Sequence, residues 1–261
     1  MDNANGLDLM RDTLNEIAPP DRAPRPLPAA GLPALKSVLA DKASIPGQAL
    51  FLGLAEDGLP VLLNLYDPIP GPILITGDQS SGKTLLLQMI ARATESLHSA
   101  SEVQYGVITS HPQEWIDFRQ SQTNAGIHAT AGESTPELLH SLVTWAHNNK
   151  GDQQSILLLI DDFEEVLKGH GQAEQDLRWL LLRGPSHRVW PIITLNAGRA
   201  GDLIDWMSFF RTRLFGRIHK PDDSQTVTGA ADARLDHLIA GAQFTMREGN
   251  TWVNFWVPTI D

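Results

Sequence analysis

The sequence contains no cysteine, which excludes disulfide bonds, thiolate metal ligands and a cysteine nucleophile. It has no apolar run near the roughly 20 residues that a membrane-spanning helix needs, and its acidic start lacks the features of a signal peptide. We therefore expect a cytoplasmic protein without membrane insertion. Positive charge is also scarce: the net charge of −11 argues against a protein that coats nucleic acid. The histidines show no metal-ligand spacing, so we expect no zinc site.

The prolines are concentrated near the N-terminus, between Pro19 and Pro33. Such a segment predicts a stiff, extended linker. Before it, Leu7, Met10, Leu14 and Ile17 are spaced as in a short amphipathic helix. We expect a flexible arm over residues 1–44 and one large domain over residues 45–261. The arm is a candidate docking segment for a partner protein, and a frayed tail is the alternative.

One glycine-rich segment, GDQSSGKT, fits the pattern G-x-x-x-x-G-K-[ST] without a mismatch. A short apolar strand precedes it and a helical pattern follows it, which is the context that turns this loop into a phosphate cradle. Lys83 then reaches the β- and γ-phosphates, and the Thr84 hydroxyl becomes a ligand for Mg²⁺. The predicted nucleotide-binding residues are Gly77, Asp78, Gln79, Ser80, Ser81, Gly82, Lys83, Thr84 and Leu85.

A second segment, Ser155 to Asp162, is a continuous apolar run that ends in two acids. The run is typical of a parallel strand buried on both faces. Because charged side chains are seldom buried without a partner, Asp161 and Asp162 require a function. In P-loop ATPases the first acid helps to hold Mg²⁺ and a second acid can polarise the attacking water. The alternative is that one aspartate caps the helix that follows.

Predicted strands alternate with predicted helices from Ala49 to the end of the chain. The strands begin with a hairpin around Glu56-Asp57-Gly58, and the later ones include Val103 to Thr109 and Val189 to Leu195. This order predicts an α/β fold with a mostly parallel sheet and helices on both faces.

The succession of motifs resembles the FtsK/HerA branch of RecA-like P-loop motor ATPases, between Ala49 and Pro258. LGLAEDGLPVLLNL resembles the hairpin before the Walker A strand, and LLLIDDFEEV resembles the Walker B segment. YGVITSHP and RVWPIITLN resemble the two neighbouring strands, and FFRTRLFGRIHKPDDSQTVTG with DHLIAGAQFTMREG resembles the family's C-terminal part. The resemblance implies a RecA-like domain that binds ATP and Mg²⁺.

The resemblance also implies roles for single residues. Asp161 matches the acid that coordinates Mg²⁺, Asp162 the catalytic glutamate, and Asn196 the glutamine that senses the γ-phosphate. Asp162 is one methylene shorter than glutamate, and Asn196 could instead be a strand-end turn residue. Glu164 and Glu165 could replace Asp162, but we expect them to face solvent. The family completes each site with a neighbour's arginine, for which Arg183 is our first candidate, followed by Arg211 and Arg213.

These features predict an Mg-ATP-hydrolysing motor subunit that acts in an oligomeric ring, with a hexamer expected. Duplex DNA is a candidate substrate, bound by pore loops such as Lys168 to Gly171, for which a plain turn is the alternative. The alternative function is an ATP-binding assembly regulator with slow or no hydrolysis. A small-molecule kinase is a weaker third hypothesis, since residues 197–213 offer only scattered arginines for a lid.

Overall fold

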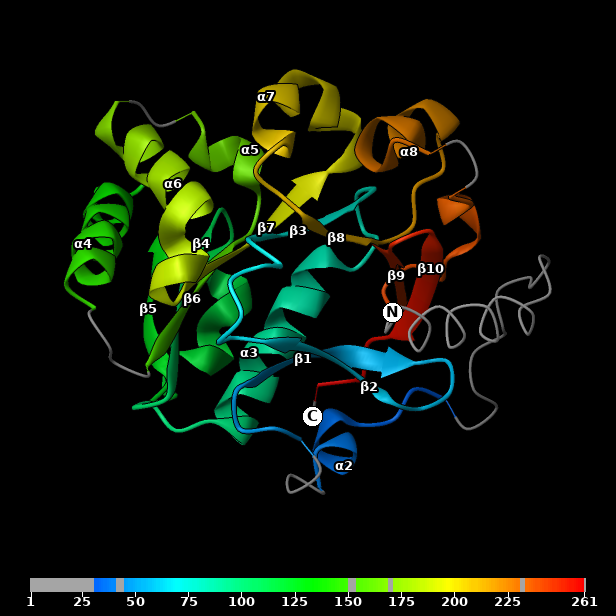
Figure 1. Ribbon diagram of the computed structural model, residues 1–261, viewed down its shortest axis with the longest axis horizontal. Helices are drawn as coiled ribbons and strands as arrows, with labels where there is room; N and C mark the ends of the chain where they lie inside the picture. The colour runs from blue at the N-terminus through cyan, green and yellow to red at the C-terminus, as the bar shows by residue number, and fades with distance from the viewer. Residues whose placement is uncertain (1–30, 41–44, 150–153, 169–170, 231–232, 261) are drawn as a thin grey trace, which may run out of the picture. The chain divides into compact units, whose positions relative to one another are not determined.

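The computed structural model describes residues 31–40, 45–149, 154–168, 171–230 and 233–260. In these residues a ten-stranded sheet has the order β2-β1-β10-β9-β8-β3-β7-β6-β4-β5. The strands, shown in Figure 1, are β1 (Ala49–Ala55), β2 (Pro60–Asn64), β3 (Ile73–Gly77), β4 (Val103–Thr109), β5 (Asn124–Ala129), β6 (Ser155–Ile160), β7 (Val189–Asn196), β8 (Thr212–Phe215), β9 (Gln243–Glu248) and β10 (Thr251–Trp256).

The sheet has a parallel part and an antiparallel part. The strands from β8 to β5 in the spatial order are parallel, and β3 lies between β8 and β7. The β9–β10 and β1–β2 hairpins extend the sheet in antiparallel fashion. The predicted mostly parallel sheet is therefore confirmed, and the carboxyl ends of β3, β6 and β7 lie together at one edge.

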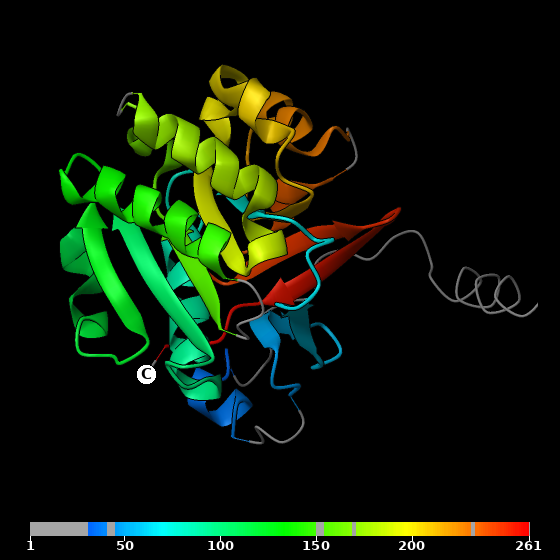
Figure 2. The same cartoon turned by 60° about the vertical axis from the view of Figure 1, so that its left-hand side comes forward.

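Helices cover both faces of the sheet, as predicted. The α-helices are α2 (Leu35–Val38), α3 (Lys83–Leu97), α4 (Ser134–Asn148), α5 (Phe163–Val166), α6 (Gln172–Arg183), α7 (Ile204–Met207) and α8 (Pro221–Thr228). The 3₁₀ segments are η2 (Pro112–Phe118), η3 (Gly184–His187), η4 (Ala197–Leu203) and η5 (Leu235–His237). Helix α3 packs on one face, and α4 and α6 lie side by side on the other (Figure 2).

Successive side chains of the central strands alternate between two hydrophobic clusters, one on each face of the sheet. Ile73 and Ile75 of β3 join the cluster under α3, whereas Leu74 between them joins the cluster under α4 and α6. All three side chains are fully buried. Burial of one such side chain contributes about 1.5–3 kcal/mol to folding. The two-sided burial explains why these strands have continuous apolar runs rather than alternating ones.

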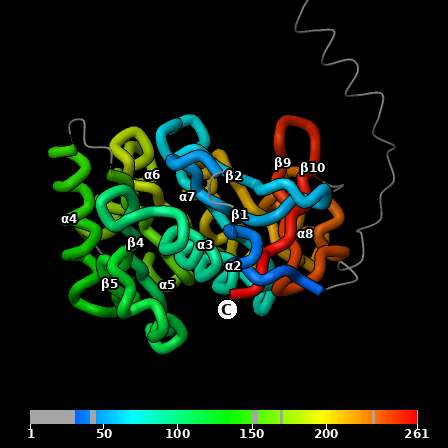
Figure 3. Tube along the Cα trace, turned by 90° about the horizontal axis from the view of Figure 1, so that it is seen from below, coloured from blue at the N-terminus to red at the C-terminus, as the bar shows by residue number. Residues whose placement is uncertain are grey.

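The predicted hairpin forms between β1 and β2, and the Gly58 amide closes its turn on the Ala55 carbonyl at 2.9 Å. The compact unit, however, begins at Leu32 rather than at residue 45. The reason is that Leu35 and Leu39 are buried in the core and the Leu35 amide donates to the Thr259 carbonyl at 2.8 Å. Figure 3 shows α2 beside α3. The predicted helix around Leu7 to Ile17 lies outside the described residues.

Strand β5 and helix α8 are two of the elements that have no counterpart among the ranges predicted from periodicity. Strand β5 has the sequence NAGIHA, with a glycine in its middle and no buried residue, and it pairs with the edge of β4. Helix α8 begins at Pro221 and has few apolar residues. None of the described helices combines the length and apolar character needed to cross a bilayer.

Candidate nucleotide-binding site

The P-loop lies where β3 ends and α3 begins, at the carboxyl edge of the sheet (Figure 1). Gly82 has φ of +98°, in the left-handed region that favours glycine. A Cβ atom at Gly82 would lie 2.6 Å from the Gly241 Cα atom, so no larger residue fits. This explains the second glycine of the motif. It lets the loop turn tightly while the C-terminal part of the chain packs against its back.

Lys83 is folded along the loop. Its Nζ atom donates to the carbonyl oxygens of Gly77 at 3.2 Å and Asp78 at 2.7 Å. Burial lowers the Lys83 pKa, whereas four surrounding carboxylates act in the opposite direction. An ammonium held in a partly desolvated site interacts strongly with an arriving anion, which suits a phosphate-binding role.

Below the loop, one carboxylate links the two motifs. The Thr84 hydroxyl donates to Asp161 Oδ2 at 2.9 Å, and the Thr194 hydroxyl donates to Asp161 Oδ1 at 2.8 Å. Asp161 is 2% exposed, and burial raises the pKa of its carboxyl group. Both oxygen atoms of this buried group are therefore satisfied by hydroxyl donors.

The Thr84–Asp161 pair fits a magnesium ion. Both groups are hard oxygen donors, and adjacent ligands of an octahedral Mg²⁺ with bonds near 2.0–2.1 Å lie about 2.9 Å apart. The two oxygen atoms are already at that separation, 2.9 Å. The remaining ligands of such an ion come from phosphate and water, since Mg²⁺ seldom takes an all-protein cage.

Asp162 follows Asp161 in a left-handed conformation, with φ of +67°. Its amide donates to the Thr194 hydroxyl at 2.9 Å, which fixes the backbone at this position. Asp162 occupies the N-cap position of α5, but its side chain makes no capping hydrogen bond. The capping alternative is therefore wrong for Asp162, whose side chain instead lines the cleft.

A cleft of about 720 Å³ opens in front of these residues, a volume in the range of small-molecule sites. It collects most of the residues predicted from the sequence: Gln79, Ser80, Gly82, Lys83, Thr84, Leu85, Asp162 and Asn196. The other predicted residues support the loop from behind. Gly77 and Ser81 are buried, and Asp161 lies under Thr84.

Asn196 has features of both interpretations of its position, a strand-end turn residue and a residue of the nucleotide site. It lies at the end of β7, and its Oδ1 atom accepts from the Gly198 amide at 3.1 Å, as in a strand-end turn. It also lines the cleft. The carbonyl oxygen of the side chain is therefore engaged by the turn, and the amide group is the part available to a ligand.

The arginine candidates lie outside the cleft of their own chain. Arg183 is exposed at the end of α6, next to the start of β7, whereas the P-loop aligns with the end of β7. The strand length puts roughly 25 Å between them. Arg213 donates to the carbonyls of Phe210, Val227 and Met207, which gives it a structural role.

Six residues of the cleft were not predicted as site residues: His111, Glu114, Glu164, Glu165, Lys168 and Arg199. The expectation that Glu164 faces solvent is wrong, because its Oε2 atom is buried. His111 has a sequence signal, since it lies between the end of strand β4 and Pro112. The other five lie in or beside short helical segments, where periodicity carries no information about direction.

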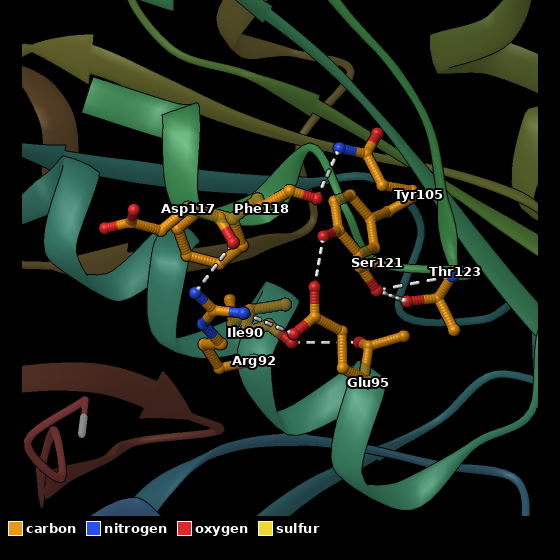
Figure 4. A network of polar contacts seen from close by, with 10 residues as sticks. Ile90, Arg92, Glu95, Tyr105, Asp117, Phe118, Ser121 and Thr123 are labelled. Carbon is orange, nitrogen blue, oxygen red and sulfur yellow. Dashed lines mark hydrogen bonds and ion pairs between the residues drawn. The ribbon is translucent and has the colours of Figure 1, made fainter. Parts of the chain in front are cut away.

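A polar network attaches η2, which carries Glu114, to α3 (Figure 4). Arg92 pairs with Glu95 at 2.8 Å, donates to the Asp117 carbonyl at 3.1 Å and lies over the Phe118 ring. The Tyr105 hydroxyl donates to Glu95 from β4, and burial raises the Tyr105 pKa. The network thus joins the cleft wall to the helix that begins at the P-loop.

The C-terminal part of the chain braces the other side of the P-loop. The Asp78 amide donates to the Arg217 carbonyl at 2.9 Å, and the His219 amide donates to Asp78 Oδ2 at 2.8 Å. The Gly241 amide donates to the Ser81 carbonyl at 2.9 Å. We call residues 217–241 the bracing segment, of which 231–232 are not described.

The comparisons identify the fold. No protein-family model and no curated protein matches the sequence. ATPases 2 and 3 of Thermomonospora curvata EccC, solved with a signal sequence peptide, match 94% of the chain with 18% identity and a TM-score of 0.68. EssC (ATPases 2 and 3) from Geobacillus thermodenitrificans matches 94% with 15% identity and a TM-score of 0.69. The pCW3 conjugation coupling protein TcpA, solved with ATPγS, matches 88% with 14% identity and a TM-score of 0.64.

This chain thus has the RecA-like fold of FtsK/HerA-type P-loop ATPases, as the sequence predicted. It spans less than half of the EccC and EssC chains, 45% and 48%, and 70% of the TcpA chain.

Proposed function

We propose that this chain binds Mg-ATP and hydrolyses it to drive a motor of FtsK/HerA type. The Thr84–Asp161 pair supports the proposal, because two oxygen donors of the kind that Mg²⁺ prefers, from separate motifs, lie 2.9 Å apart beside the P-loop. A loop that merely turned the chain would need neither the pair nor a half-buried lysine beside it.

Each residue has a defined task in this proposal. The P-loop amides and Lys83 hold the β- and γ-phosphates. Thr84 and Asp161 would hold Mg²⁺, which neutralises charge on the phosphate oxygens. The Asn196 amide lies within the same cleft, where it can contact the γ-phosphate. A carboxylate of the cleft wall orients the attacking water.

The motor part of the proposal includes a ring. We propose an oligomer, with a hexamer as the expected size, in which a neighbour's arginine completes each site; Arg183 is the first candidate. Its exposure and its distance from the cleft of its own chain favour a role at a neighbour's site. Arg199 is the competing candidate for the arginine that completes the site, because it already lines the cleft.

The substrate is proposed to be a macromolecule. The EccC structure contains a signal sequence peptide, and TcpA is a conjugation coupling protein, so polypeptide and duplex DNA are the two candidates. Lys168, one end of the candidate DNA-contacting loop, lines the cleft and pairs with Glu165 at 2.7 Å; residues 169–170 are not described. DNA-stimulated hydrolysis is the more specific hypothesis.

One experiment tests these parts in order. ADP production by the full chain is measured with Mg²⁺ and ATP, with and without duplex DNA, while mass photometry follows assembly. Lys83→Ala is the matched control, and we expect it to bind ATP at least about 100-fold more weakly. Hydrolysis by Lys83→Ala at the wild-type rate would remove the P-loop from the mechanism.

An ATP-binding assembly regulator is the second candidate. The observation that favours it is Asp162, which is shorter than glutamate and held in a left-handed conformation by its bond to Thr194. This candidate predicts tight Mg-ATP binding, ATP-dependent assembly and no ADP production in the same experiment.

A further inference from the structure

Glu164 carries a buried oxygen atom that nothing in the described ranges satisfies. The residue is the second of α5, and its Oε2 atom is shielded from solvent without a hydrogen-bond donor. A buried acceptor left unpaired destabilises the fold, and more so if it is charged. Glu164 lines the cleft together with Lys83 and Asn196. The cleft is therefore the side from which a bound molecule can approach this carboxylate group.

The next residue shows that this position is unusual. Glu165 also lines the cleft, but both of its carboxylate oxygens accept from Lys168 Nζ at 2.7 Å. Its side chain is 40% exposed. Two adjacent glutamates of one short helix thus differ: Glu165 pairs with a lysine, whereas Glu164 is bound by the backbone of Glu164 and Asn196 and its Oε2 atom has no donor among the described residues.

Glu164 lies near the Lys83 ammonium, the group that would contact the phosphates. Four carboxylates act on the Lys83 ammonium, and Glu164 has the strongest effect, ahead of Asp161 and Asp162. In a P-loop this ammonium reaches the β- and γ-phosphates. The Glu164 carboxylate is therefore one of the charges that surround the Lys83 ammonium in the cleft.

Asp162 is less suited to the same task. It is one methylene shorter, and the bond from its amide to Thr194 fixes its backbone beside Asp161. Glu164 has the longer side chain, lies in the first turn of α5 and lines the same cleft.

We propose that Glu164, rather than Asp162, is the catalytic carboxylate that activates the water; this rests on the proposed function. In the step, the water oxygen bonds to the γ-phosphorus and the bond from that phosphorus to the β–γ bridging oxygen breaks. The bridging oxygen keeps the electron pair and leaves on ADP. Glu164 accepts one proton from the water and later releases it to solvent, and inorganic phosphate leaves with the remaining proton.

The environment of Glu164 supports a proton acceptor. Burial raises the pKa of its carboxyl group, and the Asp162 charge raises that pKa further. A carboxylate with a raised pKa is a stronger base than a solvated one, which favours proton transfer near neutral pH.

The test compares Glu164→Gln, Asp162→Asn and Glu165→Gln with the wild-type chain. ADP production, the affinity for a fluorescent ATP analogue with Mg²⁺, and the bound nucleotide recovered after incubation are measured for each. We expect Glu164→Gln to bind the analogue within about 3-fold of wild type and to lose at least about 100-fold in turnover, which is the usual size of a general-base contribution. The recovered nucleotide is then ATP. Glu165→Gln and Asp162→Asn should each lose less than about 10-fold in turnover.

The outcomes separate the two proposals. A wild-type chain that binds ATP but produces no ADP overturns the proposed function and the Glu164 role together. A wild-type chain that hydrolyses ATP, with Glu164→Gln equally active, overturns the Glu164 role alone. If Glu164→Gln does not fold, Glu164→Asp takes its place, since it keeps the charge and retracts the carboxylate. Wild-type turnover by Glu164→Asp would then overturn the role.

Discussion

Asp161 is a carboxylate that the fold buries before any ligand arrives. Burial raises the pKa of this group, although the Thr84 and Thr194 hydroxyls act against the shift. A carboxyl group with a raised pKa in the folded state stabilises the fold in its protonated form. That contribution is fully present below the unfolded pKa and is lost as the pH rises through the folded pKa. At pH values above that folded-state pKa, the charged Asp161 therefore lowers the stability of the nucleotide-free domain.

The prediction is that Asp161→Asn stabilises the domain while it impairs the site. Asparagine mimics the neutral carboxyl group, so we expect a higher thermal midpoint than wild type at pH 7.5 without nucleotide. The difference should shrink as the pH falls, because wild-type Asp161 then takes up a proton. Added Mg-ATP should raise the midpoint of wild type but not of Asp161→Asn, since the variant lacks a magnesium ligand.

Thermal unfolding between pH 5 and 8, with EDTA or with Mg-ATP, measures both effects. Thr194→Ala is a useful control, since it removes one donor to Asp161 without removing the carboxylate. An Asp161→Asn variant that is less stable than wild type at pH 7.5 in EDTA contradicts the argument.

The sequence predicts residues whose chemistry depends on the local chain. Lys83 and Thr84 follow from one motif, and Asp161 follows from its place at the end of an apolar strand. Glu164 could not be found in this way. Its burial depends on how the short helix α5 turns against β7 and the cleft, and four residues are too few to show a periodic face. The same reason hides Glu114 and Arg199, which lie on 3₁₀ segments.

At the scale of elements, η2 depends on α3 for its position. Arg92 supplies an ion pair, a hydrogen bond to the Asp117 carbonyl and a contact over the Phe118 ring. Gln88 adds a bond to the Glu114 carbonyl at 2.9 Å, one turn closer to the P-loop. The η2 segment has few apolar contacts of its own beyond Trp115 and Phe118. Polar contacts from one helix therefore hold this wall of the cleft.

Arg92→Ala should lower the free energy of unfolding by about 1–3 kcal/mol, because it removes the bond, the ring contact and the partner of Glu95. Arg92→Lys keeps the charge but not the planar group, so we expect it to recover only part of the loss. Urea unfolding measures both variants. Equal urea midpoints for wild type and Arg92→Ala would mean that the network adds nothing to stability.

Elements were predictable where burial imposes a pattern. The apolar runs of β3, β6 and β7 and the long helices α3, α4 and α6 lie within a few residues of the predicted ranges. Strand β5 was not predictable, because an edge strand takes its conformation from the hydrogen bonds of β4 rather than from its own side chains. Leu35 and Leu39 were assigned to the arm for a similar reason. Their burial depends on a contact with Thr259, at the far end of the chain.

At the scale of the whole molecule, the ring hypothesis predicts that two inactive variants restore each other. Lys83→Ala subunits lack a functional P-loop and Arg183→Ala subunits lack the proposed arginine. Mixed assemblies contain interfaces with both parts intact, so we expect partial ATPase activity to return. Because an arginine finger is worth about 10³–10⁵ in rate, even a few such interfaces are measurable.

Co-assembly is checked by mass photometry on the mixture, and Arg199→Ala replaces Arg183→Ala in a parallel series. Recovery with Arg199→Ala alone would transfer the role to Arg199. A specific activity independent of protein concentration, from a chain that stays monomeric, would remove the ring motor and favour the assembly regulator.

The bracing segment couples its own position to ATP affinity in the proposed motor. The P-loop shares hydrogen bonds with Arg217, His219 and Gly241. The conformation of the loop and the position of that segment are therefore coupled. If ATP prefers one arrangement of the loop, it must shift the bracing segment by the same free energy with which that segment alters ATP affinity. The three hydrogen bonds between the P-loop and the bracing segment are sufficient for this coupling. In the proposed motor, a force that a neighbour or a cargo applied to this segment would change the nucleotide affinity, and nucleotide binding would act on the segment in return.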